Sequence, residues 1–332
     1  MSEPVICRGD EESMDVLIKV ENLRKEFRRI KAVDNISFQV QRGEVLGFLG
    51  PNGAGKSTTM RMITGFLSPT SGRIEVAGFD MVRQPLAGKR RLGYLPEGSP
   101  AYADMTPAGF LDFVAGIRKL SGPEKKQRID AAVAQVHIEK IMHQPIETLS
   151  KGFKRRVGLA QAIMHDPDIL ILDEPTDGLD PNQKQEVRTL IRHMAPHKAI
   201  VLSTHILEEV EPLCTRVVVI ARGRLLADET PEAFASRSRQ HDAVTLTLPS
   251  HQAAAARQIL ANLPEVAELE TLTENPDRVT IRLLPKPGVH LAALVGAMAH
   301  THGWSLEKLF VDRGHLDEAF RTLTQATDPH PP

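Results

Sequence analysis

A glycine-rich segment that ends in a lysine and a serine carries the strongest chemical signal in this chain. Its residues are Gly50, Pro51, Asn52, Gly53, Ala54, Gly55, Lys56 and Ser57, followed by Thr58. Glycines at this spacing let backbone N–H groups turn inward around an anion, and a helix that follows adds its positive N-terminal end. Lys56 would then neutralise the β- and γ-phosphates of a nucleotide, Ser57 would ligate Mg²⁺, and Thr58 would bond the α-phosphate. The segment therefore predicts a site for ATP or GTP.

Two acidic residues supply the remaining parts of a phosphoryl-transfer site. Asp173 and Glu174 directly follow the apolar run Ile169–Leu172. An acid at the carboxyl end of a parallel strand lies in the crevice where ligands bind. Asp173 would hold Mg²⁺ through water and Glu174 would polarise the attacking water, as transfer of a phosphoryl group to water requires. The plainer alternatives are a chance glycine-rich turn and an exposed helix cap at residue 173.

Apolar runs alternate with helical segments from residue 16 to about residue 228. Strands are expected at Val16–Val20, Ile36–Val40, Val45–Leu49, Ile169–Leu172, Ala199–Ser203 and Val217–Ile220. This alternation is typical of an α/β fold with a mainly parallel core sheet. The third run leads into the glycine-rich segment, and a helix is expected from Ser57. Residues 106–142 show a helical pattern without strands, which predicts a helical insert.

The chain changes character after about Asp228, where a short helix and a polar linker are expected. The pattern beyond is strand, helix, strand, strand, helix, strand, the order of a ferredoxin-like domain, and a further helix follows. The expected elements are 243–248, 251–263, 266–272, 278–284, 290–300, 304–311 and 316–323. We therefore expect a flexible extension over residues 1–14, a nucleotide-binding domain over 15–230 with a helical subdomain at about 99–165, an α+β domain over 231–325 and a tail over 326–332.

Composition limits the classes of function. The 332 residues are 41% hydrophobic and 25% charged, with a net charge of -1, so there is no basic excess and no nucleic acid partner is expected. The two cysteines, Cys7 and Cys214, are far apart in the sequence and suggest neither a disulfide framework nor a metal pair, which fits a cytosolic location. The start lacks a signal-peptide core, and Met14 is an alternative first residue. No apolar run reaches the roughly 18–20 residues of a membrane-spanning helix.

Further motifs narrow the meaning of the phosphate-binding segment. Leu149-Ser150-Lys151-Gly152-Phe153 lies about twenty residues before Asp173 and resembles the signature motif of ABC ATPases. Glu174-Pro-Thr-Asp-Gly-Leu-Asp180 resembles their D-loop, and Ser203-Thr-His205 resembles their switch histidine. Gly93-Tyr-Leu-Pro-Glu97 stands at their Q-loop, and Phe27 stands where an aromatic ring stacks on adenine. These motifs cover residues 16 to about 228, so the resemblance implies a P-loop ABC ATPase core with a helical subdomain.

The resemblance also implies roles for individual residues. Lys56, Ser57 and Thr58 would bind phosphate and Mg²⁺, and Glu97 and Asp173 would join Ser57 around the metal ion. Glu174 would be the catalytic base. His205 would contact the γ-phosphate and hold the attacking water. Ser150 and Gly152 would touch the γ-phosphate of ATP on a second subunit, because the family completes each site only in a head-to-tail dimer.

Three residues depart from the usual pattern of the family. Lys151 and Phe153 stand in the signature where glycine and glutamine are common, and Glu97 replaces the glutamine of the Q-loop. Glutamate at this place together with this signature resembles the branch that powers ABC-2 exporters, including gliding-motility and copper-site-assembly systems. The C-terminal segment resembles the small accessory domain that many members of this branch carry.

The resemblance therefore implies an ATP-hydrolysing subunit of a membrane transporter, with ATP and Mg²⁺ as cofactors. Two such subunits would drive a separate membrane-spanning permease through a groove near the Q-loop and the helical insert. A homodimer is favoured, with a paralogous second subunit as the alternative. The subunit would then be peripheral on the cytoplasmic face of the membrane. The alternatives are a non-transport ABC ATPase acting on ribosomes or DNA, and a regulatory protein that binds ATP without turnover. The transported substrate is not specified by this chain.

Overall fold

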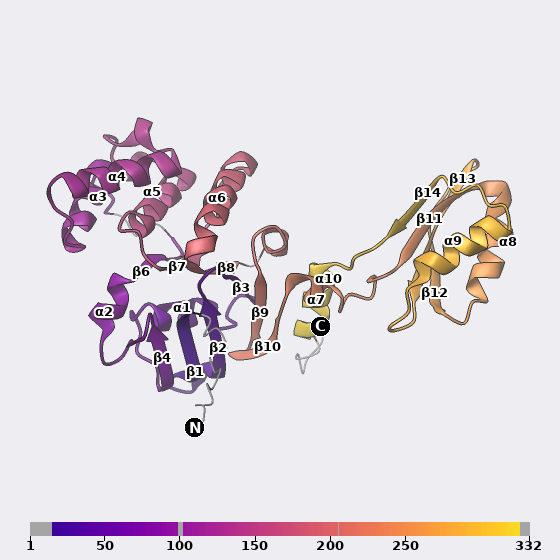
Figure 1. Ribbon diagram of the computed structural model, residues 1–332, viewed down its shortest axis with the longest axis horizontal. Coiled ribbons are helices and arrows are strands. Elements are labelled where there is room, and N and C mark those ends of the chain that lie inside the picture. The colour runs from indigo at the N-terminus through magenta and orange to yellow at the C-terminus, as the bar shows by residue number, and fades with distance from the viewer. Residues whose placement is uncertain (1–14, 99–101, 205, 326–332) are drawn as a thin grey trace, which may run out of the picture. The chain divides into compact units, whose positions relative to one another are not determined.

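The computed structural model describes residues 15–98, 102–204 and 206–325. The chain divides into two compact units, of which the first ends at Asp228 and the second begins at Glu229 (Figure 1). Cys7, Met14 and His205 lie outside the described residues. Among the helices that the structure describes, none is long and apolar enough to cross a membrane.

A six-stranded sheet forms the centre of the first unit. Its strands, in spatial order, are β10 (Arg224–Glu229), β9 (Arg216–Ala221), β3 (Val45–Leu49), β8 (Ala199–Thr204), β7 (Ile169–Asp173) and β6 (Leu92–Leu95). The pairs from β9 to β6 are parallel. Strands β3, β7 and β8 are buried along their whole length, as continuous apolar runs in a parallel sheet should be. The expected α/β fold with a mainly parallel core sheet is therefore confirmed.

A second sheet of four strands lies in the same unit. Its order is β2 (Ile30–Gln41), β1 (Val16–Phe27), β4 (Ser71–Val76) and β5 (Phe79–Asp80), with neighbouring strands antiparallel. Strands β1 and β2 are longer than the runs predicted from the sequence, because their outer halves alternate between buried and exposed residues. The two sheets share one hydrophobic core, in which the rings of Phe38 and Phe48 lie 5.6 Å apart.

Helices connect the strands of the first unit. They are α1 (Lys56–Ile63), α2 (Pro85–Arg90), α3 (Pro107–Ile117), α4 (Gly122–Val136), α5 (Lys151–Ile163) and α6 (Pro181–Met194), with short 3-10 turns at Glu139–Ile141, Ile146–Thr148, Ala195–His197 and Leu207–Glu209. Figure 1 shows α3, α4 and α5 grouped together, and α5 packs against the edge strand β6. Described residues 102–164 contain no strand, so the helical insert extends from α3 through α5.

The second unit has its own core and its own sheet. Its elements are α7 (Pro231–Ala235), β11 (Val244–Pro249), α8 (Ser250–Ala261), β12 (Val266–Glu274), β13 (Arg278–Pro285), α9 (Leu291–Thr301), β14 (Lys308–Val311) and α10 (Leu316–Gln325). The sheet order is β12-β13-β11-β14, with antiparallel neighbours, which is the ferredoxin-like arrangement of two interleaved strand-helix-strand halves. The last strand is shorter than predicted, because Trp304 turns back to donate its N–H to Ala299 at the end of α9.

Two isoleucines of β2 test the burial of the first unit. Ile36 is fully buried, whereas Ile30 in the same strand is 70% exposed. Ile36→Ala removes buried methyl groups and leaves a cavity, so we expect it to lower the free energy of unfolding by about 2–5 kcal/mol. Ile30→Ala should change that free energy by no more than about 0.5 kcal/mol. Urea denaturation of the two variants measures the difference, and equal losses would contradict this placement of β2.

Candidate nucleotide site

The glycine-rich segment forms a tight turn between β3 and α1. At Gly50, a Cβ atom would lie 2.3 Å from the carbonyl oxygen of Ile220 in β9. At Gly55 the backbone has φ +111°, and a Cβ atom would lie 2.5 Å from the carbonyl oxygen of Ala32. Real Cβ atoms do not approach backbone oxygens so closely, so only glycine allows the loop to fold back against its neighbouring strands. Helix α1 then begins at Lys56 and directs its N-terminus at the loop.

Lys56 is buried inside the turn. It is 7% exposed, and its Nζ donates to the carbonyl oxygens of Gly50 at 2.7 Å and Pro51 at 3.2 Å. Burial lowers the pKa of the Lys56 ammonium group, while the nearby carboxylates of Glu174 and Asp173 act in the opposite direction. The loop carbonyls thus hold the charged end of Lys56 over the turn, where an anion would meet it.

A cavity of about 290 Å³ opens beside this loop. It is lined by Ala32, Asn52, Gly53, Gly55, Lys56, Ser57, Thr58, Glu97 and Glu174. The structure therefore brings the phosphate-loop residues together with two carboxylates that follow β6 and β7. Glu97 and Glu174 reach one cavity because the carboxyl ends of neighbouring parallel strands lie at the same edge of the sheet.

Asp173 and Glu174 differ in their surroundings. Asp173 ends β7, is 2% exposed, and accepts a hydrogen bond from the hydroxyl of Ser203 in β8. Glu174 follows with φ +53°, a left-handed conformation that non-glycine residues rarely adopt. Its backbone N–H donates to the carbonyl oxygen of Ser203 at 3.0 Å. This backbone turn takes the Glu174 side chain out of the strand and into the wall of the cavity.

The donor groups around the cavity fit Mg²⁺. They are the hydroxyl of Ser57 and the carboxylates of Glu97 and Glu174 in the cavity wall, with Asp173 beside them. In the part of the chain that the structure describes, no three His, Cys, Asp or Glu side chains cluster as a metal cage. Mg²⁺ keeps several waters and is usually held by one or two protein oxygens together with substrate phosphates, so this sparse set suits it.

The signature segment lies at the start of helix α5, away from this cavity. Ser150 caps the helix by accepting a hydrogen bond from the N–H of Phe153 at 3.3 Å, and it is exposed. Gly152 is buried, and a Cβ atom there would lie 2.7 Å from the side chain of Gln183. Lys151 forms an ion pair of 2.8 Å with Asp177, so its additional charge is already paired. Neither Ser150 nor Gly152 lines the cavity of its own chain.

Two other predicted residues also lie apart from the cavity wall. Asp180 caps α6 by accepting a hydrogen bond from Gln183 N–H at 2.9 Å, and its side chain is exposed. Phe27 is at the end of β1 and is 44% exposed, with the ammonium of Lys25 5.1 Å from its ring centroid. Because the ring is partly exposed at a strand end, it remains accessible to a flat ligand.

Sequence reasoning missed two buried charged residues next to the site. Arg155 of α5 donates to backbone carbonyls at the ends of β6 and β7. Glu209 is 1% exposed, accepts from the Thr176 hydroxyl at 2.5 Å, and lies 3.2 Å from the Lys184 ammonium. No motif marks either residue, since both roles depend on which segments fold next to them.

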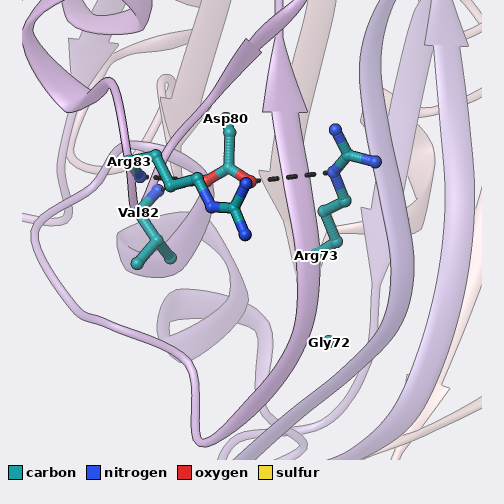
Figure 2. Close-up of a pocket in the computed structure, with 5 residues that line it drawn as sticks. All are labelled: Gly72, Arg73, Asp80, Val82 and Arg83. Carbon is teal, nitrogen blue, oxygen red and sulfur yellow. Dashed lines mark hydrogen bonds and ion pairs between the residues drawn. The ribbon is translucent and has the colours of Figure 1, made fainter.

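A second hollow, of about 380 Å³, opens at the antiparallel sheet and is lined by Gly72, Arg73, Asp80, Val82 and Arg83. Figure 2 shows the Asp80 carboxylate between Arg73 and Arg83. One carboxylate oxygen accepts from the backbone N–H groups of Val82 at 2.9 Å and Arg83 at 3.0 Å, and the other lies 3.7 Å from Arg73 Nε. Asp80 thus offsets the positive charge here, and none of the predicted nucleotide-site residues lines this hollow.

A third hollow, an apolar groove of about 920 Å³, lies between the core sheet and the helical insert. Its apolar wall includes Phe66, Leu86, Tyr94, Tyr102, Phe110, Phe113 and Ile117, and its cationic residues are Arg61, Lys89, Arg90, Arg118 and Lys119. Several of the apolar side chains are unusually exposed: Phe66 at 70%, Leu86 at 74% and Ile117 at 63%. A contiguous exposed apolar patch of this kind marks an interaction surface.

Gly55 provides a test of the loop geometry. Gly55→Ala introduces a collision with the Ala32 carbonyl, so we expect the affinity for ATP to fall by more than about tenfold, or about 1.4 kcal/mol. Gly78 is the control, because it also has a positive φ (79°) but a Cβ atom there meets nothing within 4 Å. Gly78→Ala should leave ATP affinity unchanged in titrations with a fluorescent ATP analogue. If Gly55→Ala also binds normally, the loop does not have the tight geometry described above.

Comparison with known proteins identifies this arrangement. A family model described as ABC transporter matches residues 33–177. The linearmycin resistance ATP-binding protein LnrL of Bacillus subtilis is 30% identical over 312 residues, covering 94% of this chain and 99% of that protein. A solved ATP-binding subunit of an ABC transporter is 30% identical with a TM-score of 0.62, covering 67% of this chain and 92% of that one.

A second solved structure, a dimeric ATP-binding cassette in a post-hydrolysis state bound to ADP and Pi, resembles the chain in fold. It is 21% identical with a TM-score of 0.61 and covers 65% of this chain and 99% of that one. The likeness to LnrL extends over nearly the whole sequence, and the phosphate loop, the adjoining carboxylates and the helical insert all stand in one unit. The chain therefore belongs to the ABC transporter family, as an ATP-hydrolysing subunit.

Proposed function

We propose that two copies of this chain close head to tail around two ATP molecules and drive a separate membrane-spanning subunit of an exporter. The observation that carries this proposal is the division of the site. One cavity holds the phosphate loop with Glu97 and Glu174, while Ser150 and Gly152 lie outside it. A second copy is the simplest source of the missing groups, because each chain has one loop and one signature to offer.

Each residue of the cavity then has a task in hydrolysis. Lys56 exchanges its hydrogen bonds to the loop carbonyls for bonds to the β- and γ-phosphates. The negative charge of the phosphates then offsets the cost of burying the ammonium group. Ser57, Asp173 and Glu97 would hold Mg²⁺ directly or through water, and the bound ion would supply charge neutralisation at the phosphate oxygens. Glu174 accepts a proton from the attacking water. His205 holds the γ-phosphate and that water, and Phe27 stacks on adenine.

The signature of the second copy completes the site electrostatically. Ser150 is exposed and stands at the N-terminus of a 13-residue helix. Such a terminus carries a partial positive charge and free donors suited to a phosphate. Binding of ATP between the loop of one copy and the signature of the other would hold the dimer together, and hydrolysis would release it.

The membrane partner would dock in the apolar groove. The groove combines exposed aromatic and aliphatic side chains with a basic rim, so it suits an amphipathic helix with acidic residues at its ends. The groove is formed by the core sheet and by the insert that carries Ser150, so closure of the site would move both of its walls. On this proposal the protein is peripheral on the cytoplasmic face of the membrane.

We further propose that the transporter exports its substrate. Glu97 in place of the usual glutamine and the Lys151-containing signature are shared with the ABC-2 exporter branch that the sequence resembles. The matched relative whose name indicates linearmycin resistance has the same overall length as this chain within a few per cent. A ribosome- or DNA-acting ATPase or a non-hydrolysing regulator receives no comparable support from these comparisons.

Glu174 provides the test of hydrolysis. Glu174→Gln keeps the shape of the side chain but cannot accept a proton, so we expect turnover to fall by about a thousandfold while ATP affinity is retained. The variant should also accumulate as an ATP-bound dimer in size-exclusion chromatography, because release depends on hydrolysis. Glu139→Gln, on the helical insert, is the control and should hydrolyse ATP normally. Unchanged turnover in Glu174→Gln would show that another group is the base.

Ile117 tests the docking groove. Ile117→Glu places a charge in the apolar wall, so we expect the membrane-bound share of the protein in fractionated cells to fall several-fold, since burying an unpaired charge costs several kcal/mol. The ATPase activity of the purified variant should stay unchanged because Ile117 lies outside the nucleotide cavity. Val82→Glu, at a side chain that is 58% exposed outside the groove, is the matched control and should fractionate normally.

A further inference from the structure

Arg155 is a buried cation that touches two separate parts of the ATPase site without lining its cavity. It lies in the second turn of α5, a few residues after the Ser150 cap, and is 4% exposed. One terminal nitrogen donates to the carbonyl oxygens of Pro96 at 2.6 Å and Gly98 at 2.8 Å. The other donates to the carbonyl oxygens of Asp173 and Glu174. One guanidinium group therefore joins four backbone carbonyls from two segments.

These two segments carry the two carboxylates of the cavity. Pro96 and Gly98 flank Glu97, which follows β6, and Glu174 follows the neighbouring strand β7 and lines the same cavity. The peptide groups of Glu174 are held from two sides, because its N–H donates to the Ser203 carbonyl and its carbonyl accepts from Arg155. This double fixation maintains the left-handed backbone of Glu174, at φ +53°, which directs its side chain.

A guanidinium group suits this task better than any other side chain. Its planar fork presents several N–H donors in fixed directions, so it can satisfy both segments at once, whereas a lysine ammonium is a point charge on a flexible stem. Burial lowers the pKa of the Arg155 guanidinium, and the carboxylates of Asp173, Asp177, Glu174 and Glu97 act against that effect. The charge of Arg155 is thus retained in the interior by the carboxylates it helps to place.

We propose that Arg155 is a positioning residue that sets Glu97 and Glu174 relative to each other and fixes both to the signature helix α5. Any movement of α5, whose N-terminus carries Ser150, is then transmitted directly to the two carboxylates of the same chain. This inference rests on the proposed function only in treating Glu174 as the catalytic base. It adds a residue that no motif of the sequence assigns.

Arg156 offers a matched control in the neighbouring position. It is also buried, at 7% exposed, and in the described part of the chain its Nε, like that of Arg155, has no hydrogen-bond partner. Its terminal nitrogens instead contact the carbonyl of Val136 at 3.3 Å and the carboxylate of Glu186 at 2.7 Å, which lie within the helices. Replacing either arginine with lysine disturbs a buried cation of α5, but only Arg155 contacts the two catalytic segments.

The test compares Arg155→Lys with Arg156→Lys in the full chain. Because loss of positioning without loss of contacts to substrate slows the chemical step, we expect Arg155→Lys to lower kcat about 100-fold and to leave the KM for ATP within about threefold. Arg156→Lys should keep kcat within about twofold, since it touches neither segment. Thermal unfolding of both proteins shows whether they remain equally folded. Equal kcat values in the two equally folded variants would overturn the inference.

A double-mutant cycle separates positioning from general structural damage. In a Glu174→Asp background the carboxylate is already displaced, so Arg155→Lys should lower kcat by no more than about threefold further, which is a strongly non-additive result. A full additional 100-fold loss would show that Arg155 acts independently of Glu174 and would overturn the inference. Failure of the proposed function is recognised separately, because in that case Glu174→Gln itself retains hydrolysis.

Discussion

The nucleotide site depends on two glycines, Gly50 and Gly55, whose backbone packs directly against the carbonyl oxygens of adjacent strands. Strand β3 is buried in the middle of the parallel sheet, between β8 and β9, and the chain must turn sharply as it leaves that sheet. At Gly50 the backbone passes so near the Ile220 carbonyl of β9 that no Cβ atom fits. This packing fixes where the loop closes and where α1 starts. The positions of Lys56 and Ser57 follow, because they are the first residues of that helix.

Buried cations complement the acidic residues at this edge of the sheet. Lys56 and Arg155 are both nearly inaccessible, and both donate to backbone carbonyls rather than to carboxylates. The hydrogen bonds of these cations are made to backbone carbonyls, so the nearby carboxylates are left available for Mg²⁺ and water. Of these two cations only Lys56 lines the cavity, so its bonds to the loop carbonyls hold it where a phosphate can replace them.

The helical insert connects the chemistry to surfaces outside the site. Helix α5 carries the exposed Ser150 at its N-terminus, the buried Arg155 in its second turn, and further along a face that packs against β6. The same insert supplies one wall of the apolar groove. Because close-packed elements move as rigid bodies, a movement of α5 would shift its N-terminus, the carbonyls bound to Arg155 and one wall of the groove together.

Much of the fold could be predicted from short stretches of sequence. Val45–Leu49 forms a strand with the predicted bounds, because the apolar run is short and is bounded by turn residues on one side and the glycine-rich segment on the other. The ferredoxin-like order of the second unit was likewise readable from its alternating pattern. The antiparallel sheet was not predicted as a separate sheet, because β1 pairs with β2 across register shifts and with the distant strand β4 through contacts that no local pattern marks.

The sequence by itself determined the phosphate loop and the acids at residues 173 and 174, because the chemistry of each is contained within a few adjacent residues. Only the tertiary structure decided that Glu97 and Glu174 share one cavity, that Ser150 and Gly152 stand outside it, and that Arg155 joins the two strand ends. Those relations involve segments about 20 to 100 residues apart, and they depend on the pairing of β6 with β7 and on how helix α5 packs against the edge of the sheet, rather than on any local pattern.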